Sequence, residues 1–164
     1  MNIAALAEQN VERFGEYDAY FWQDRWHTNV EGVENARRFA NALTSMGVGP
    51  GDRVAVMLPN CIEVFFAYGG TLGVGGVVVP VVFLLAPGEI NHILADCEPK
   101  VLITSPLFLD KAREAIQGLP NPPRLVIFGD PVPDDATSWN ALMSAASTEH
   151  ATVDRSAEDI AVIM

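Results

Sequence analysis

The most prominent feature of the hydropathy pattern is a run without charge that extends from Val64 to Ala86, between Glu63 and Glu89. A transmembrane helix would need about 20 apolar residues in one continuous helix. Five glycines and one proline interrupt this run, and no Lys or Arg flanks it. The pattern therefore favours a segment that is buried inside a globular core over a membrane span.

The uncharged run divides into a helix, a glycine corner and a strand. Apolar residues recur at helical spacing over residues 62–72. Glycines then stop the helix, because each costs about 1 kcal/mol relative to alanine in a helix. The valines at 77–79 are typical of a strand, which Pro80 ends because it has no N–H to donate. The glycines of this corner are Gly73, Gly75 and Gly76.

Helical and strand patterns alternate along the rest of the chain. Two capping boxes are predicted, one from Thr28 with Glu31 and one from Asn60 with Glu63. This alternation predicts an α/β fold with a largely parallel sheet flanked by helices. Helices are predicted over 3–14, 29–46, 61–72, 87–97, 107–117 and 139–146, strands over 19–22, 26–28, 54–58, 77–79, 101–104, 125–128 and 160–164, and loops over 129–138 and 147–158.

Composition excludes several classes of function. The formal net charge of −11 repels phosphate backbones, and no cluster of Lys and Arg offsets it, so nucleic-acid binding is not expected. Cys61 and Cys97 lack a CxxC spacing and are expected as reduced thiols, with a disulfide as the minority interpretation. The N-terminus has no signal-peptide pattern, so a cytoplasmic protein without a transmembrane segment is expected.

The glycine-rich corner does not match a nucleotide-binding loop. A dinucleotide fingerprint that began at Gly73 and Gly75 would need glycine at position 78, where the chain has Val78. The glycines also follow a helix and precede a strand, which is the reverse of the required order. Close packing is therefore the favoured interpretation of this corner. The sequence contains neither a Walker A motif nor a nucleophile elbow.

The remaining polar candidates are weak. Asp134-Asp135 and Glu158-Asp159 could be paired carboxylates, but both lie in polar loops and are expected as solvated charge. The helix dipole could lower the pKa of the Cys61 thiol, although a packed apolar side chain is favoured there. The histidines His27, His92 and His150 form no zinc-binding spacing. A surface position is expected for His92 and a structural role for His27. The sequence therefore predicts no catalytic, cofactor-binding or metal-binding residue in this chain.

One stretch of the chain resembles a known family. The run GVGPGDRVAVMLPNCIEVFFAYGGTLGVGGVVVP is similar to the N-terminal region of AMP-forming acyl-CoA synthetases, which belong to the adenylate-forming enzymes. Glu12 to Gly15 also fits, so the resemblance covers nearly the whole chain. The matching positions are Gly47, Gly51, Asp52, Val54, Pro59, Asn60, Glu63, Gly76, Val77, Pro80 and the strand at 101–104.

The chain also departs from the family pattern. A Thr-Tyr-x-Glu-Leu motif is usual in the family, and here Thr28 and Glu31 keep the capping pair without the two packing residues. Gly75 stands where alanine is commoner in the family, and Phe83 stands where the family often has asparagine after its Pro-Leu pair. The resemblance implies that residues 1–164 are a partial N-terminal subdomain, an incomplete part of the large domain, truncated before the phosphate-binding loop.

The resemblance implies a function for the longer parent protein. That parent would convert a carboxylate and ATP to an acyl-adenylate and then transfer the acyl group to CoA, with ATP, Mg and CoA as its cofactors. No cofactor is expected in this chain, which is expected to be inactive alone. Its expected partners are the missing C-terminal remainder of the parent and a second copy that pairs through an exposed sheet edge.

Two alternatives stay open. The chain could be a naturally short, non-catalytic α/β module that binds a ligand or associates with itself. It could also belong to a relative that makes an adenylate for a carrier protein or an oxidase, and the sequence before residue 164 does not discriminate this chemistry.

Overall fold

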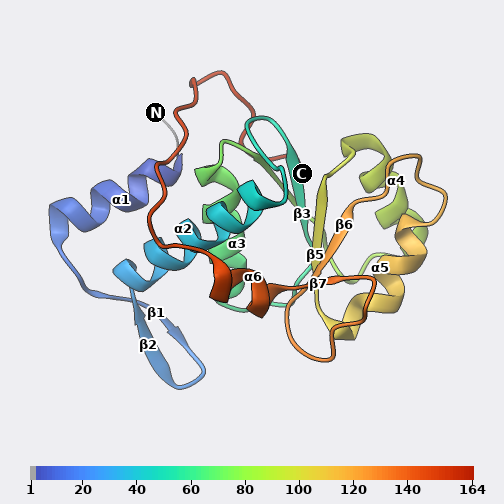
Figure 1. Cartoon of the computed structure of the whole chain (residues 1–164), viewed down its shortest axis with the longest axis horizontal. Helices are drawn as coiled ribbons and strands as arrows, with labels where there is room; N and C mark the ends of the chain where they lie inside the picture. Colours follow the sequence, from blue (N-terminus) through green and yellow to red (C-terminus); the bar gives the residue numbers. More distant parts are fainter. Residues whose placement is uncertain (1–2) are drawn as a thin grey trace.

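The central element of the computed structural model is an open, five-stranded parallel sheet (Figure 1), and the structure describes residues 3–164. The strand order is β4-β3-β5-β6-β7. Every neighbouring pair runs parallel, so each connection must cross from one end of the sheet to the other. The strands are β3 (Arg53–Val56), β4 (Val77–Pro80), β5 (Val101–Thr104), β6 (Arg124–Ile127) and β7 (Thr137–Ser138).

Helices cover both faces of this sheet (Figure 1), which confirms the predicted fold class. One face packs against α2 (Asn29–Ser45), α3 (Glu63–Gly73) and α6 (Trp139–Ala145). The other face packs against α4 (Pro87–Cys97) and α5 (Leu109–Ile116), which follows the 3₁₀ turn η1 (Pro106–Phe108).

Two elements lie outside these layers. The amphipathic helix α1 (Ile3–Phe14) lies against α2 and α3 and has no fully buried residue. The strands β1 (Asp18–Trp22) and β2 (Arg25–Thr28) form a separate antiparallel hairpin that projects from the body of the molecule (Figure 1).

The two covered faces explain why the interiors of β3, β4, β5 and β6 are apolar. Val54 and Val56 of β3 point into the cluster beneath α2 and α3, whereas Ala55 points into the cluster beneath α4 and α5. Consecutive side chains of a strand alternate between faces, so a strand covered on both sides has no solvated position. No helix within residues 3–164 is long and apolar enough to cross a membrane.

Helices α2 and α3 approach each other through small residues. A Cβ atom on Gly70 would lie 2.8 Å from Cβ of Phe39 and 2.9 Å from the carbonyl oxygen of Ala36. A Cβ on Gly69 would lie 2.8 Å from Cβ of Ala36. Side chains at these positions would push the helices apart, since distances below 3.0 Å are not tolerated. The glycines of the uncharged run therefore serve helix packing.

The corner between α3 and β4 confirms the packing interpretation of its glycines. Gly75 has a φ of +72°, in the left-handed region that side chains rarely adopt. A Cβ on Gly76 would lie 3.0 Å from the carbonyl oxygens of both Asp52 and Thr71. Backbone carbonyls therefore pack against Gly76, and the Gly76 N–H donates to the Thr71 carbonyl at 2.8 Å.

The first predicted capping box is confirmed. Glu31 N–H donates to Thr28 Oγ1 at 3.1 Å, and Thr28 N–H donates to Glu31 Oε2 at 3.1 Å. The second one is wrong: α3 begins at Glu63, its N-cap is Ile62, and no side chain caps it. Ile62 is buried, and a tight turn precedes the helix, so Asn60 lies too early in the chain to cap it.

Two further predictions differ from the structure. The predicted loop over 129–138 contains the short strand β7, which pairs with β6 at Val126 and Ile127. The predicted strand over 160–164 forms a single bridge, between Val78 and Val162. Both segments contain only a few paired residues, so their strand character depends on the neighbouring strand rather than on a local pattern.

We predict that Gly70→Ala lowers the free energy of unfolding by about 2 kcal/mol, because the added methyl group overpacks the contact between α2 and α3. Urea denaturation followed by circular dichroism measures this change. Gly88→Ala is the matched control, since a Cβ at Gly88 meets nothing within 4 Å and its φ is not positive. Equal stability of the two variants would contradict the close approach of the helices.

Candidate functional site

The strand order places a topological switch point between β3 and β5. The chain passes from β3 to β4 on one side and then returns to β5 on the other side of β3. Open parallel sheets commonly bind ligands at the carboxyl ends of the strands beside such a point. The candidate site is therefore the group of loops that leave this edge, formed by residues 57–62, 81–86 and 105–108.

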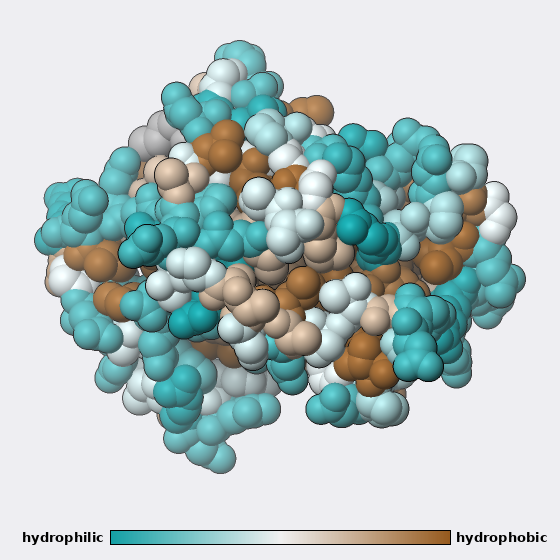
Figure 2. All heavy atoms as spheres, viewed as in Figure 1, coloured by the Kyte–Doolittle hydropathy of each residue, from teal (hydrophilic) through white to brown (hydrophobic). Residues whose placement is uncertain are grey.

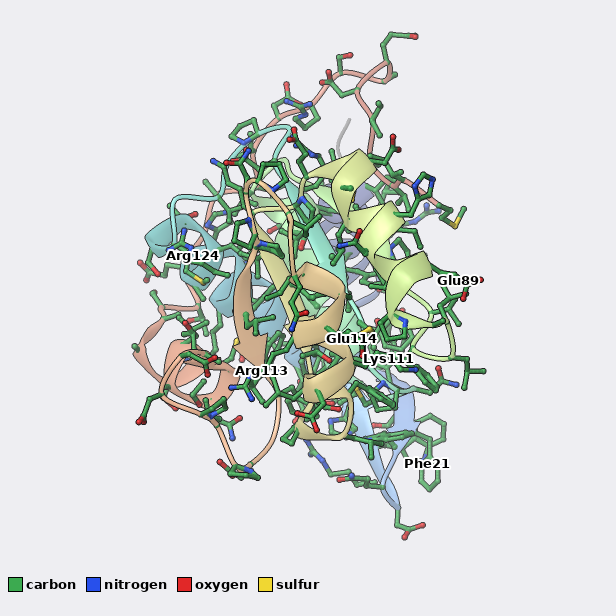
Figure 3. All side chains as sticks on the ribbon, turned by 90° about the vertical axis from the view of Figure 1, so that its right-hand side faces the viewer. Phe21, Glu89, Lys111, Arg113, Glu114 and Arg124 are labelled. Atoms are coloured by element: carbon green, nitrogen blue, oxygen red, sulfur yellow. The ribbon has the colours of Figure 1, made fainter. Side chains whose placement is uncertain are left out.

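An apolar hollow of about 340 Å³ lies beside the loop that follows β3. The hairpin contributes aromatic side chains to one wall, and the Tyr20 ring lies 5.1 Å from the Phe65 ring. Figure 3 places Phe21 on the hairpin, well apart from the charged side chains of α5. The volume falls within the range of small-molecule pockets. Its lining consists of Tyr20, Phe21, Trp22, Asn60, Cys61, Ile62, Val64 and Phe65.

Cys61 is the nucleophilic side chain of this hollow, but its environment opposes ionisation. Burial raises the pKa of the Cys61 thiol to about 11, and the negative charge of Glu63 adds to the shift. The thiolate, rather than the thiol, is the nucleophile. The side chain is thus the packed apolar group that the sequence favoured, and the helix dipole does not activate it.

The carboxyl end of β5 contains two buried hydroxyl groups that the sequence did not single out. Thr104 is fully buried and Ser105 is 7 % exposed. Neither Thr104 Oγ1 nor Ser105 Oγ has a hydrogen-bond partner among residues 3–164. A buried hydroxyl without a partner costs about 1–3 kcal/mol. The one available signal was a polar pair directly after the apolar strand at 101–103.

The loops after β4 and β5 hold each other in place. The rings of Phe83 and Phe108 stack with their centroids 4.7 Å apart, and Lys111 Nζ donates to the Phe83 carbonyl at 2.6 Å. Leu84 and Leu107 lie on these loops with 79 % and 78 % of their surfaces exposed. The candidate site is thus a fixed and mostly apolar edge.

A second hollow, of about 390 Å³, lies between α1, α2 and α3. Arg37 donates twice to Glu8 Oε1, at 3.0 and 2.8 Å, and so ties α1 to α2 across it. His150 closes its other side, since its ring nitrogens lie 2.9 Å from Asn41 Oδ1 and 3.4 Å from the Gly73 carbonyl. These contacts make the hollow a gap between packed helices, with His150 in a structural role.

The other polar candidates are dispersed over the molecule. Asp134 and Asp135 are exposed, and Asp135 pairs with Arg113 at 2.6 Å. Glu158 is exposed, as expected for solvated loop charge, whereas the exposed Asp159 pairs with Arg155 at 3.2 Å. His92 is exposed, and His27 Nδ1 lies 3.4 Å from Glu31 Oε2 in the capping box. Residues 3–164 contain no group of three or more His, Cys, Asp or Glu side chains that could hold a metal ion.

Comparison with protein families identifies the chain. The family model described as AMP-binding enzyme matches residues 7–164. The chain belongs to this family. The family is that of the adenylate-forming enzymes, which confirms the resemblance seen in the sequence.

Members of the AMP-binding enzyme family with known activities resemble this chain over most of its length. It is 32 % identical over 126 residues to a 3-hydroxybenzoate/4-hydroxybenzoate CoA ligase from Thauera aromatica, covering 77 % of this chain and 24 % of that protein. It is 33 % identical over 151 residues to a crotonobetaine/carnitine CoA ligase from Salmonella paratyphi A, covering 88 % of this chain and 29 % of that protein. The chain thus spans under a third of these relatives.

Solved structures of the family show the same fold. The chain superposes on the anthranilate CoA ligase AuaEII in complex with anthranoyl-AMP with a TM-score of 0.93 and 26 % identity. This match covers 99 % of the chain and 31 % of the ligase. A benzoate CoA ligase from Burkholderia xenovorans gives a TM-score of 0.85 at 27 % identity, with 99 % of this chain and 32 % of that one covered.

We predict that Glu63→Gln accelerates alkylation of Cys61 by iodoacetamide several-fold at pH 8. Removing the nearby negative charge lowers the pKa of the thiol and so increases the thiolate fraction. Peptide mass spectrometry separates the reaction of Cys61 from that of the buried Cys97. Glu114→Gln is the control, because Glu114 is exposed and lies on α5 (Figure 3). An unchanged rate in Glu63→Gln would show that burial alone suppresses the thiolate.

Proposed function

We propose that residues 1–164 are the partial N-terminal subdomain of an AMP-forming CoA ligase. The parent enzyme joins a carboxylate to AMP at the expense of ATP, releases pyrophosphate, and then forms a thioester with CoA. The observation that carries this proposal is the superposition of 99 % of the chain on a CoA ligase in complex with its acyl-adenylate. The relatives act on aromatic and aliphatic carboxylates, so the substrate class is a carboxylic acid.

The described residues do not fit the cofactors of this reaction. ATP and Mg²⁺ require backbone amides or cations for the phosphates and oxygen ligands for the metal. The N–H groups of Gly75 and Gly76 already donate to the carbonyls of Leu72 and Thr71, and residues 3–164 hold no cluster of metal ligands. We therefore assign no step of the reaction to this chain. ATP, Mg and CoA belong to the proposed parent, which we place in the cytoplasm.

What this chain would supply is a scaffold. Its sheet fixes the carboxyl edge, and the stacked rings of Phe83 and Phe108 fix the loops that leave this edge. Binding residues would then come from the much longer remainder, which is the proposed partner of these 164 residues. Whether the parent is a thioester ligase or another adenylate-forming enzyme depends on that remainder.

A second candidate function has one observation in its favour. The sheet is open beside β4, where a single bridge at Val162 is the last pairing. An open edge can pair with another chain. We propose that the isolated chain associates with itself there, as a short non-catalytic α/β module would.

The gene sequence downstream of codon 164 tests the proposed parent. We expect it to encode a loop rich in Ser, Thr and Gly with a lysine, in the same reading frame and shortly after Met164. A stop codon at that place would contradict the proposed ligase and would favour the short module.

We predict that purified residues 1–164 release no pyrophosphate from ATP when benzoates, carnitine or fatty acids are added with CoA and Mg²⁺. The physical reason is that the amides of the glycine corner are already hydrogen-bonded to backbone carbonyls and that the described residues hold no cluster of metal ligands. A coupled pyrophosphate assay measures the rate, and a full-length relative serves as the positive control. Carboxylate-dependent release above the rate without enzyme would overturn the proposed inactivity.

A further inference from the structure

Three side chains connect the hairpin to the start of α2. His27 lies in β2 and is 9 % exposed. Arg25 Nη2 lies 2.8 Å from His27 Nδ1, and Glu31 Oε2 lies 3.4 Å from the same nitrogen. Arg25 Nη1 also donates to Glu31 Oε1 at 3.3 Å. One ring nitrogen of a buried histidine therefore faces both a cation and an anion.

The guanidinium group determines which form of the His27 ring fits this arrangement. Arginine is always charged and offers only N–H donors. Arg25 can therefore bond to His27 Nδ1 at 2.8 Å only if that nitrogen presents a lone pair, which places the proton of the neutral ring on Nε2. In this form Nδ1 has no proton to donate to Glu31, so the neutral ring is bonded to Arg25 alone of the two charged groups.

A proton on Nδ1 reverses this preference. The new N–H faces the N–H of Arg25, and the two positive charges repel each other. Because the ring is buried, its charge needs a partner close by. Partial desolvation opposes ionisation of Glu31, but the Thr28 N–H and the Arg25 guanidinium hold the pKa of this carboxyl below its ordinary value. Glu31 Oε2 is thus a carboxylate oxygen with room for a second donor beside the Thr28 N–H.

The other titratable groups of the hairpin lie further along its two strands and in its turn. Tyr20 of β1 lies opposite His27, and Asp18 lies at the end of the hairpin away from the turn. Asp24 lies in the turn and directly precedes Arg25. Asp24 is therefore a second carboxylate that is available to Arg25 when the guanidinium leaves the ring.

The turn of the hairpin is strained and depends on such anchors. Gln23 and Asp24 have φ values of +48° and +58°, in the left-handed region that glycine tolerates best. Two-residue turns with both φ values positive strongly favour Asn-Gly or Asp-Gly, and this turn has neither. Trp22 and Arg25 flank the turn and pair with each other. The contact between Arg25 and His27 therefore helps to fix the tip of the hairpin, and its loss loosens the tip.

We propose that His27 is a proton-operated switch: the neutral ring holds Arg25 and fixes the hairpin tip, whereas the protonated ring binds Glu31 and releases Arg25. The hairpin also supplies the aromatic wall of the hollow beside the loop that follows β3, so the switch links pH to the order of that wall. The three side chains lie within residues 25–31, so the switch requires neither the assignment to a ligase nor the remainder of a parent protein.

Long-range ¹H–¹⁵N NMR spectra of residues 1–164 detect the protons on the ring directly. Histidine rings gain their charge between about pH 8 and about pH 5. At the upper end of this range we expect His27 to carry its proton on Nε2, with Nδ1 bare. As the pH falls, we expect both ring nitrogens to become protonated and the side-chain nitrogen signals of Arg25 to change over the same pH interval. The exposed His92 serves as the internal reference.

Two variants separate the roles of the cation and the anion. Arg25→Met removes the charge that opposes protonation, so we expect the ratio of protonated to neutral His27 to rise several-fold at a given pH. Glu31→Gln removes the partner of the protonated ring, so we expect this ratio to fall several-fold. The matched controls are Arg113→Met and Glu114→Gln, which change the net charge equally but lie on α5, well apart from the hairpin (Figure 3). We expect neither control to change the ratio appreciably.

Amide hydrogen exchange, corrected for the intrinsic rate at each pH, measures the order of the hairpin tip. We expect residues 22–26 to exchange several-fold faster after protonation of His27, and His27→Gln, which cannot be protonated, to remove this pH dependence. An Nδ1–H tautomer of the neutral ring, or Arg25 signals that stay constant while His27 becomes protonated, would overturn the switch. Equal His27 ratios in Arg25→Met and Arg113→Met, or pH-dependent exchange that persists in His27→Gln, would also overturn it.

Discussion

The close approach of α2 and α3 is the contact on which the rest of this structure depends. Gly69 and Gly70 have no side chains, so the two helices can pack against each other and still cover one face of the sheet. The same closeness brings Gly73 to the start of the corner, which returns the chain to β4. Much of the uncharged run is buried between these layers, where a charge would lack a partner, although Phe65 remains 57 % exposed.

This packing also determines what the candidate site can do. The carboxyl edge of the sheet is the usual place for a ligand, but its loops here are fixed by ring stacking and present exposed leucines rather than convergent polar groups. Cys61 is kept as a thiol by burial and by Glu63. The buried hydroxyls of Thr104 and Ser105 are unsatisfied within residues 3–164. These features suit a scaffold whose chemistry comes from other parts of a longer enzyme.

Local physical signals made several elements predictable. The capping box of Thr28 and Glu31 could be predicted from the sequence, because both partners lie within one turn of the same helix. The identical argument failed at Asn60, because burial of Ile62 moved the helix start along the chain. The hollow beside the hairpin was not predictable, since Tyr20 and Phe65 meet only through the tertiary fold. The pairing of β7 was missed for the same reason, because Thr137 and Ser138 acquire strand character from β6.

The sequence alone determined the fold class, the corner of glycines and the family resemblance, because each depends on residue types at fixed spacing along the chain. The tertiary structure decided which groups are satisfied and which are not. The state of the Cys61 thiol, the orphaned hydroxyl of Ser105 and the bridge between Val78 and Val162 depend on the packed surroundings of each group. The burial of a group and its hydrogen-bond partners are decided by the elements that pack around it, which are separated along the chain and meet only in the folded structure.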